Sequence, residues 1–407
     1  MNKQNIRWLY AAVGTIILLF AGLVYAWSVL SSPIAAEFSQ WSQSQLSLTF
    51  TLVMTFFCVG GLAAGLVARK LNPKFNVWIS GVLFLLGFIV SSFTQNLLTL
   101  YLGFGICCGF ASGFVYNAVM STVSRWFPDQ QGLISGILLM GFGIGSFLIG
   151  KVYQAAIPAD IGGWRIGFRV IGVVIFVLFV ICAFFLVKPG ADYQLPAAKQ
   201  KKKVGKVLSE STTSQMLKTP TFWLYFVWAI LLSAAGLSLI SQASGVAREV
   251  GTGVSAGTIA TVVGLISIFN GLGRILFGGL FDRIGRSLTM LAISGAFIVT
   301  AIILVIALQT GSFPLIVVGF ICGGLAYSGV TPTNSAFVNT YYGPKNYAVN
   351  LPMINLNLII ASFGSTVAGA LYDSTKSYFA VYLLMAGLAV VGILVSLGIS
   401  VFDKKRK

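Results

Sequence analysis

Long apolar segments, separated by short polar breaks, run through the chain from end to end. Each segment is long enough to cross a bilayer as an α-helix, which needs about 20 residues. Their approximate bounds are 8–30, 44–68, 76–95, 97–124, 132–156, 165–187, 221–247, 255–281, 287–309, 313–338, 346–372 and 377–402. The pattern therefore predicts an all-α integral membrane protein with twelve transmembrane helices.

One long polar segment, residues 188–220, interrupts this pattern and contains the basic run Lys199-Gln200-Lys201-Lys202-Lys203. Its charge is typical of a solvent-exposed linker, part of which we expect to be helical. It separates residues 1–187 from residues 221–407, with six predicted helices and 187 residues on each side. Equal halves indicate a duplicated unit. We therefore predict two pseudo-symmetric six-helix bundles joined by a basic cytoplasmic linker.

The composition supports a membrane protein and excludes several functions. Hydrophobic residues make up 57% of the 407 residues and charged residues only 9%, whereas about 25% of the residues of a soluble domain are charged. The chain has no histidine, and its nine Asp and Glu residues are scattered. Imidazole triads and imidazole metal sites are thereby excluded, and no carboxylate metal cage is indicated. We expect no enzyme activity, metal or cofactor.

The net charge of +17 follows the rule for membrane topology rather than the pattern of a nucleic-acid-binding protein. With both termini on one side of the membrane, twenty of the 26 Lys and Arg residues fall in segments on that side and five on the other. Positive residues concentrate in cytoplasmic loops. We therefore expect a multi-pass protein of the inner (cytoplasmic) membrane, with both termini in the cytoplasm. The lipid bilayer is its expected surrounding, a monomer its expected state, and no nucleic acid partner is predicted.

The remaining cation, Arg274, lies near the middle of the predicted span 255–281. A guanidinium there costs at least about 2.5–3.5 kcal/mol, and no Asp or Glu lies within a predicted span. The structural alternative is an arginine that extends to the interface, about 10 Å away along the helix. The functional interpretation, which we favour, is an anion site, because the planar fork pairs with a carboxylate through two hydrogen bonds. Asn270 is one turn away on the same face.

Other polar and aromatic residues within the spans are candidates to complete such a site. They are Tyr25, Tyr116, Asn117, Tyr327 and Asn355. For each of them the alternative is structural, since tyrosines also form interfacial belts and asparagines also join helices. Gly105, Gly109 and Gly113 are spaced by four in the span 97–124, and this spacing predicts close packing against another helix.

The segment Gly278-Gly279-Leu280-Phe281-Asp282-Arg283-Ile284-Gly285-Arg286 follows the eighth predicted span. It resembles the cytoplasmic-loop motif of the major facilitator superfamily, and the resemblance extends over the whole chain. The resemblance implies the superfamily fold and a cytoplasmic gate formed with Gly278, Asp282, Arg283, Gly285 and Arg286. In the counterpart after the second span, residues 65–74, Arg69 stands where the motif has its Asp.

Within the superfamily the chain resembles the oxalate:formate antiporter and bacterial monocarboxylate transporter group. The segments that carry this resemblance include Tyr25-Ala26-Trp27-Ser28, Val115-Tyr116-Asn117, Arg125-Trp126-Phe127-Pro128 and Asn270-Gly271-Leu272-Gly273-Arg274. The resemblance implies that Arg274 binds substrate and that Tyr25, Tyr116 and Tyr327 line the cavity. The oxalate antiporter has a lysine in its eleventh span where this sequence has Ile354. One cation suits a monoanion better than a dianion.

These observations predict a secondary active transporter of a small organic monoanion, such as lactate, pyruvate or formate, that works by alternating access. The predicted spans contain no Asp, Glu or His, the usual membrane-embedded proton carriers. We therefore expect anion exchange, or symport in which the substrate's own carboxyl carries the proton. Three alternatives stay open: a larger amphipathic anion such as a conjugated bile salt, oxalate:formate exchange, and a transporter-like sensor.

Overall fold

The computed structural model describes all residues except 1–2, 42, 69, 157–161, 191–209 and 406–407. Within this part of the chain the regular structure is helical, without β-strands. Contacts divide the chain into two units. Unit 1 comprises Met1–Asp129, Ile137–Lys201 and Tyr347–Met353, and unit 2 comprises Gln130–Gly136, Lys202–Asn346 and Ile354–Lys407. The domain boundary in the linker remains a prediction, because residues 191–209 lie outside the described residues.

The first half of the chain forms six apolar spans, some of them built from more than one helical segment. The segments are α1 Lys3–Ala21, η1 Gly22–Ala26, α2 Trp27–Glu37, α3 Gln43–Val67, α4 Pro73–Ser92, α5 Leu97–Leu100, η2 Tyr101–Cys108, α6 Gly109–Val123, η3 Ser124–Trp126, α7 Gln131–Ala156 and α8 Trp164–Ala183. Some of these helices begin directly after a polar residue whose side chain caps the first turn. The side chain of Asn72, for example, accepts a hydrogen bond from the Lys74 amide directly before α4, and Pro73 fills the first turn.

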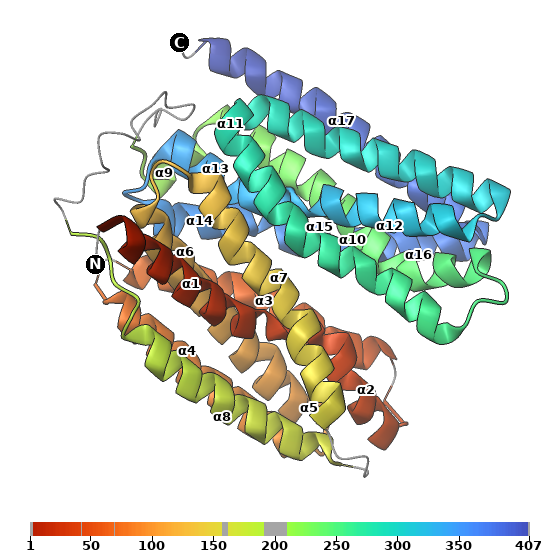
Figure 1. Ribbon diagram of the computed structural model, residues 1–407, viewed down its shortest axis with the longest axis horizontal. Coiled ribbons are helices and arrows are strands. Elements are labelled where there is room, and N and C mark those ends of the chain that lie inside the picture. The colour runs from red at the N-terminus through yellow and green to blue at the C-terminus, as the bar shows by residue number, and fades with distance from the viewer. Residues whose placement is uncertain (1–2, 42, 69, 157–161, 191–209, 406–407) are drawn as a thin grey trace. The chain divides into compact units, whose positions relative to one another are not determined.

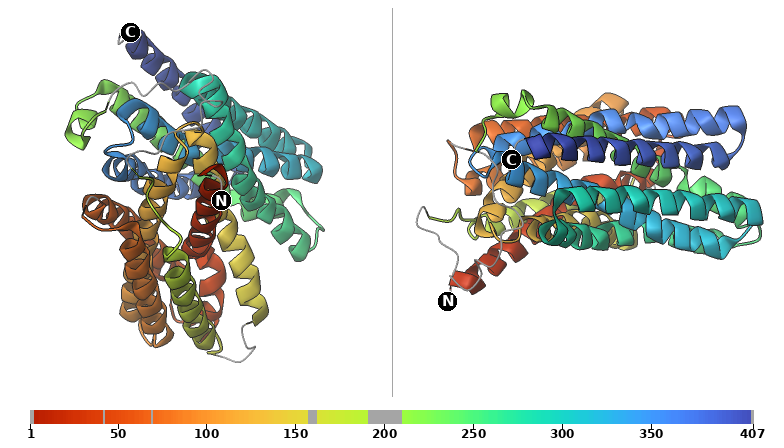
Figure 2. Two further views of the ribbon diagram at one scale, coloured as in Figure 1. Left: turned by 60° about the vertical axis from the view of Figure 1, so that its left-hand side comes forward. Right: turned by 90° about the horizontal axis from the view of Figure 1, so that it is seen from above.

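The second half begins with a short helix from the predicted linker and continues with further long apolar helices. The segments are α9 Thr213–Leu217, α10 Pro220–Val250, α11 Ala256–Thr310, α12 Phe313–Ser328, α13 Val330–Tyr342, α14 Tyr347–Asn355, α15 Asn357–Ala361, α16 Phe363–Thr375 and α17 Tyr378–Lys405. The hydroxyls of Thr219 and Ser255 cap α10 and α11 by accepting amides of their first turns. In unit 2, α12 lies alongside α11 (Figure 2).

Helix α11 spans 55 residues, which would measure roughly 80 Å at about 1.5 Å per residue. It cannot be one transmembrane span, because a hydrocarbon core is about 30 Å thick. Its backbone leaves the helical conformation at Gly285, with φ 77° and ψ 179°, and Figure 1 shows two arms on either side of this bend. The described chain contains 11 helices long and apolar enough to cross a membrane. Counted as two arms, α11 supplies the twelfth span, as predicted.

Two spans of unit 1 depart from α-helical geometry. The first passes through the 3₁₀ stretch η1, Gly22–Ala26, before it continues as α2. The fourth contains the π-helical stretch η2, Tyr101–Cys108, between α5 and α6. Both forms are less common than the α-helix, and within long helices they often mark functional positions. Tyr25, one of the predicted site residues, lies in η1.

Glycines set the closest helix contacts of unit 1. An added methyl group at Gly109 or Gly113 on α6 would overlap backbone atoms of Val53 or Phe57 on α3, and one at Gly105 would contact the Leu52 side chain. The predicted close packing along this glycine ladder is thus confirmed. Each such position lets two backbones approach without an intervening side chain, which is the usual way that membrane helices pack tightly.

Candidate functional site

Arg274 lies on the first arm of α11, where its side chain is half-buried. Its backbone is in close contact with α7, because an added methyl group at Gly136 would overlap the carbonyl group of Arg274. Asn270 is half-buried one turn earlier on α11. Its Oδ1 atom is buried and has no hydrogen-bond partner among the described residues. The predicted pair of Arg274 and Asn270 therefore places a cation one helical turn from a buried amide oxygen that has no hydrogen-bond partner among the described residues.

Tyr327, near the end of α12, is brought to Arg274 by helix packing. The guanidinium lies close enough to interact electrostatically with the phenol. The hydroxyl of the next residue, Ser328, occupies the space that a side chain at Gly273 would need, so α12 meets α11 directly beside Arg274. The ring of Tyr327 lies against Gly236 of α10. Arg274 and Tyr327 thus lie at the same contact between two consecutive helices of unit 2, α11 and α12.

The eleventh span contributes polar residues that are mostly engaged in helix packing. Asn357 donates from Nδ2 to the Ile354 carbonyl at 2.5 Å and accepts at Oδ1 from the Ser233 hydroxyl of α10 at 3.2 Å. Asn355, the predicted site residue, ends α14 with 6% of its surface exposed. Ile354 is completely buried. The Asn357 amide therefore joins this span to α10.

Tyr25 and Tyr116, predicted to line the cavity, share an aromatic cluster in unit 1. Both rings pack against Phe142 of α7, at centroid distances of 5.3 Å and 5.6 Å. Phe50 and Phe57 of α3 complete the cluster, at 6.0 Å from Tyr25 and 5.2 Å from Tyr116. The sequence reasoning did not find Phe142, because nothing in the apolar pattern distinguishes it from the other phenylalanines of the chain.

Asn117 of α6 is almost completely buried and joins three helices of unit 1. Its Nδ2 donates to the carbonyl of Gly61 on α3 at 2.8 Å and to the carbonyl of Ala348 on α14 at 2.6 Å. Both amide hydrogens are thereby used in helix packing. Its Oδ1 is buried without a hydrogen-bond partner in the described chain, so any ligand contact of Asn117 would be made by that oxygen.

The predicted gate motif surrounds the bend of α11. The Asp282 carboxylate accepts the backbone N–H groups of Gly132 and Leu133, both at 2.8 Å, in the first turn of α7. A negative charge at a helix N-terminus is stabilised by the unpaired amides and by the helix dipole. Gly132 and Gly278 face each other so closely that a methyl group on either would overlap the carbonyl of the other. The carboxylate and the glycine pair together hold α7 against α11.

The other motif residues complete this end of unit 2. Arg286 is buried and donates to the Tyr341 hydroxyl at 2.9 Å and to the Ser400 hydroxyl at 3.2 Å. Arg283 is exposed, and Gly285 makes the bend. Of the degraded counterpart, Gly65 packs against the backbone of Ala348, while Arg69 lies outside the described residues.

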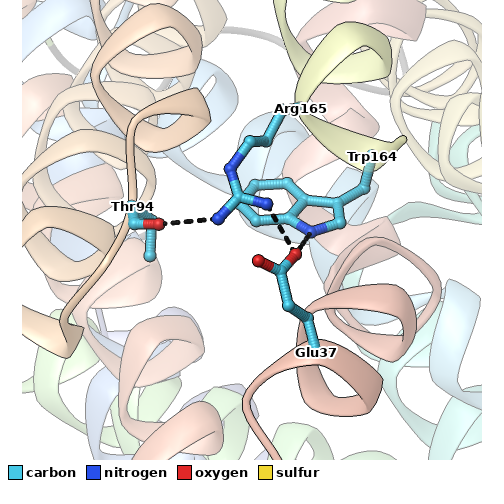
Figure 3. Close-up of polar contacts among 4 residues, drawn as sticks. All are labelled: Glu37, Thr94, Trp164 and Arg165. Carbon is cyan, nitrogen blue, oxygen red and sulfur yellow. Dashed lines mark hydrogen bonds and ion pairs between the residues drawn. The ribbon is translucent and has the colours of Figure 1, made fainter. Parts of the chain in front are cut away.

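A second charged cluster joins α2, α8 and the turn after α4 in unit 1 (Figure 3). Glu37 accepts at one carboxylate oxygen from Arg165 at 2.5 Å and from the Trp164 indole at 2.7 Å, and Arg165 also donates to the Thr94 carbonyl at 3.0 Å. The hydrogen bond from Arg165 holds the pKa of the Glu37 carboxyl below its ordinary value, although partial burial acts in the opposite direction. This ion pair ties together three elements that are distant in sequence.

Comparison with known proteins places these features in a family. The chain is 25% identical over 345 residues to the oxalate:formate antiporter of Oxalobacter formigenes, covering 84% of this chain and 80% of that protein. It is 24% identical over 403 residues to monocarboxylate transporter 12 of Rattus norvegicus, covering 91% and 81%.

The fold is similar to that of the crystal structure of the transporter FucP in the outward conformation, with a TM-score of 0.69, 13% identity and coverage of 96% of this chain and 98% of that one. The Major Facilitator Superfamily profile matches residues 11–356 and, in a second match, residues 253–407. The all-α fold and its apolar spans agree with this match, and the chain belongs to the Major Facilitator Superfamily.

Proposed function

We propose that this transporter moves small organic monoanions by alternating access, with Arg274 as the residue that binds the carboxylate. The observation that carries the proposal is the place of Arg274 within an apolar span, half-buried, where Gly273 of α11 packs against Ser328, the residue after Tyr327. A guanidinium in that position favours a bound carboxylate, since its fork can donate two parallel hydrogen bonds and the anion offsets the cost of the buried charge.

A monoanion fits the charge of this site better than a dianion. Ile354 stands where the oxalate antiporter, by the resemblance, has a lysine, and Ile354 is completely buried. A second carboxylate would therefore lose its hydration without gaining a second cation, at a cost of several kcal/mol. Lactate, pyruvate and formate are the favoured substrates. The relatives named as an oxalate:formate antiporter and a monocarboxylate transporter support the substrate class at low identity.

Exchange is the coupling that we propose, with substrate-carried proton symport as its variant. The predicted spans contain no Asp, Glu or His, the usual membrane-embedded proton carriers. Exchange of one anion for another, or symport on the substrate's own carboxyl, needs no such side chain. The aromatic residues Tyr25, Tyr116 and Tyr327 are proposed to close around the substrate. The bias of positive residues supports a multi-pass arrangement in the inner membrane with both termini in the cytoplasm.

Counterflow in proteoliposomes tests the proposal. Vesicles with purified protein are preloaded with unlabelled formate, lactate, pyruvate, oxalate, malonate or a conjugated bile salt, and the uptake of labelled lactate is measured with and without a pH gradient. We expect internal monocarboxylates to accelerate uptake well above the rate of empty vesicles. Net uptake that follows the pH gradient and is not accelerated by internal substrate would exclude exchange.

Two variants of Arg274 test the site itself. Arg274→Gln removes the charge and the fork, so lactate binding should be lost; Arg274→Lys keeps the charge alone and should retain weak binding. Arg248→Gln, which removes an exposed cation in the last turn of α10, is the matched control. Binding at the wild-type affinity by Arg274→Gln would disprove the anion site, and stronger competition by oxalate than by formate would disprove the preference for monoanions.

A further inference from the structure

Gly236 on α10 determines where the ring of Tyr327 can lie. A methyl group added to Gly236 would overlap three atoms of that ring, Cγ, Cδ2 and Cε2. The neighbouring α10 residues Leu232, Ala235 and Leu239 are completely buried. The ring therefore lies against α10 at a position that has no side chain.

The backbone of α12 has no room to move away from α10. A methyl group at Gly324 would overlap the backbone of Ile266 on α11, and the Ser328 hydroxyl already fills the space beside Gly273. These contacts hold α12 between α10 and α11. A side chain at position 236 must consequently be accommodated by rotation of the Tyr327 ring rather than by a shift of the helix.

The backbone near Tyr327 is also fixed by the sequence that follows it. Pro332 lacks the N–H group that would bond to the Ser328 carbonyl in a continuous α-helix. The α-helical hydrogen bonding is accordingly interrupted between α12 and α13, although Gly329 keeps helical backbone angles, with φ −72° and ψ −26°. Gly329 itself is packed against Ile293 and Phe277 of α11. The ring position of Tyr327 is thus set by a fixed backbone on one side and by Gly236 on the other.

We propose that Gly236 is a specificity-determining positioning residue: by having no side chain, it sets the place of the Tyr327 ring and hence the size of anion that fits beside Arg274. The inference rests on the proposed function, because it assumes that the anion binds at Arg274. Gly236 does not touch the substrate; it acts through Tyr327. Gly236 controls where the Tyr327 ring lies, and the ring's volume in that place limits the size of the anion.

The test measures the binding of three monoanions of increasing size, formate, lactate and benzoate, to the purified full-length protein by titration calorimetry. In Gly236→Ala the displaced ring should narrow the site. We expect the dissociation constant to rise by about tenfold or more for benzoate and by less than about threefold for formate, because steric exclusion grows with ligand size. The matched control is Gly387→Ala on α17, an exposed glycine whose added methyl group contacts nothing within 4 Å.

A second substitution separates this mechanism from general damage to the fold. In the Tyr327→Ala background the atoms that the new methyl group would overlap are gone, so adding Gly236→Ala should not change the order of the three affinities any further, a coupling that a double-mutant cycle measures. An equal loss of affinity for all three anions, or the same additional loss in both backgrounds, would overturn the inference. If Arg274→Gln abolishes binding while Gly236→Ala leaves all three affinities unchanged, the inference fails and the proposed function stands. If Arg274→Gln binds normally, the proposed function fails first.

Discussion

Asp282→Asn removes the negative charge that faces the first turn of α7. The carboxylate accepts two backbone N–H groups at 2.8 Å, one at each oxygen. Asparagine keeps one acceptor and presents an NH₂ group to the other amide. The loss of one charge-assisted hydrogen bond costs about 1.5–3 kcal/mol, and the lost charge at the helix N-terminus adds about 0.3–1 kcal/mol. We expect the contact between α7 and α11 to weaken by about 2–4 kcal/mol in total.

Hydrogen exchange followed by mass spectrometry measures this effect where it arises. A weakening of about 2–4 kcal/mol should accelerate the exchange of the Gly132 and Leu133 amides by roughly 30- to 1,000-fold, if they exchange by local opening. The melting temperature should fall by about 4–10 °C. Glu249→Gln, the same charge change at an exposed acid near the end of α10, is the control and should alter neither. Unchanged exchange at Gly132 and Leu133 in Asp282→Asn would refute the assignment of Asp282 as the cap of α7.

Further predictions concern packing, pH and charge. Gly278→Ala, but not its neighbour Gly279→Ala, should lower the melting temperature, because only the methyl group at Gly278 would overlap backbone; equal effects would contradict the contact. Glu37→Gln should lower the melting temperature at pH 7. Because the pKa of Glu37 is lowered in the fold, the ion pair stabilises the protein above the ordinary pKa of Glu. That stabilisation is lost as the pH falls through the lowered value. The difference between wild type and Glu37→Gln should therefore vanish in strong acid, and a difference that persists there would contradict the ion-pair mechanism. Ile354→Lys should lower the melting temperature, because the side chain is completely buried, and it should shift the competition for binding from formate toward oxalate, because it supplies a second cation. A folded Ile354→Lys variant that still prefers formate to oxalate would contradict the single-cation argument.

The transmembrane helices could be predicted from sequence because each apolar segment must satisfy its backbone hydrogen bonds within itself. The predicted bounds of α7, 132–156, differ from the structure by a single residue. The sequence predicts separate eighth and ninth spans. In the structure they are joined by a single bend at Gly285, where one residue with a positive φ reverses the chain without a loop. The stretches η1 and η2 were not foreseen, since 3₁₀ and π geometry leaves the apolar pattern unchanged.

The candidate site could be predicted only in part. Arg274 is conspicuous in a sequence because a charge within an apolar span is costly. The contact of Tyr327 with Gly236 depends on which residue α12 places opposite α10, and no pattern along either helix encodes this. Asp282 and Gly132 are 150 positions apart, so the cap on α7 follows from the fold alone. The role of Asn117 in joining α3, α6 and α14 likewise emerges from packing, not from residue type.

The contact of Gly136 with the backbone of Arg274 has a thermodynamic consequence for transport. If the Arg274 side chain binds the anion, one residue of α11 serves two partners, the anion on its side chain and α7 on its carbonyl. Their binding free energies are then linked, and linkage is reciprocal. If the bound anion strengthens the contact with α7 by a given free energy, breaking that contact weakens the binding of the anion by the same free energy. If the anion weakens the contact, breaking it strengthens the binding. The binding of the anion and the separation of α7 from α11 would thus be thermodynamically coupled through one residue, Arg274.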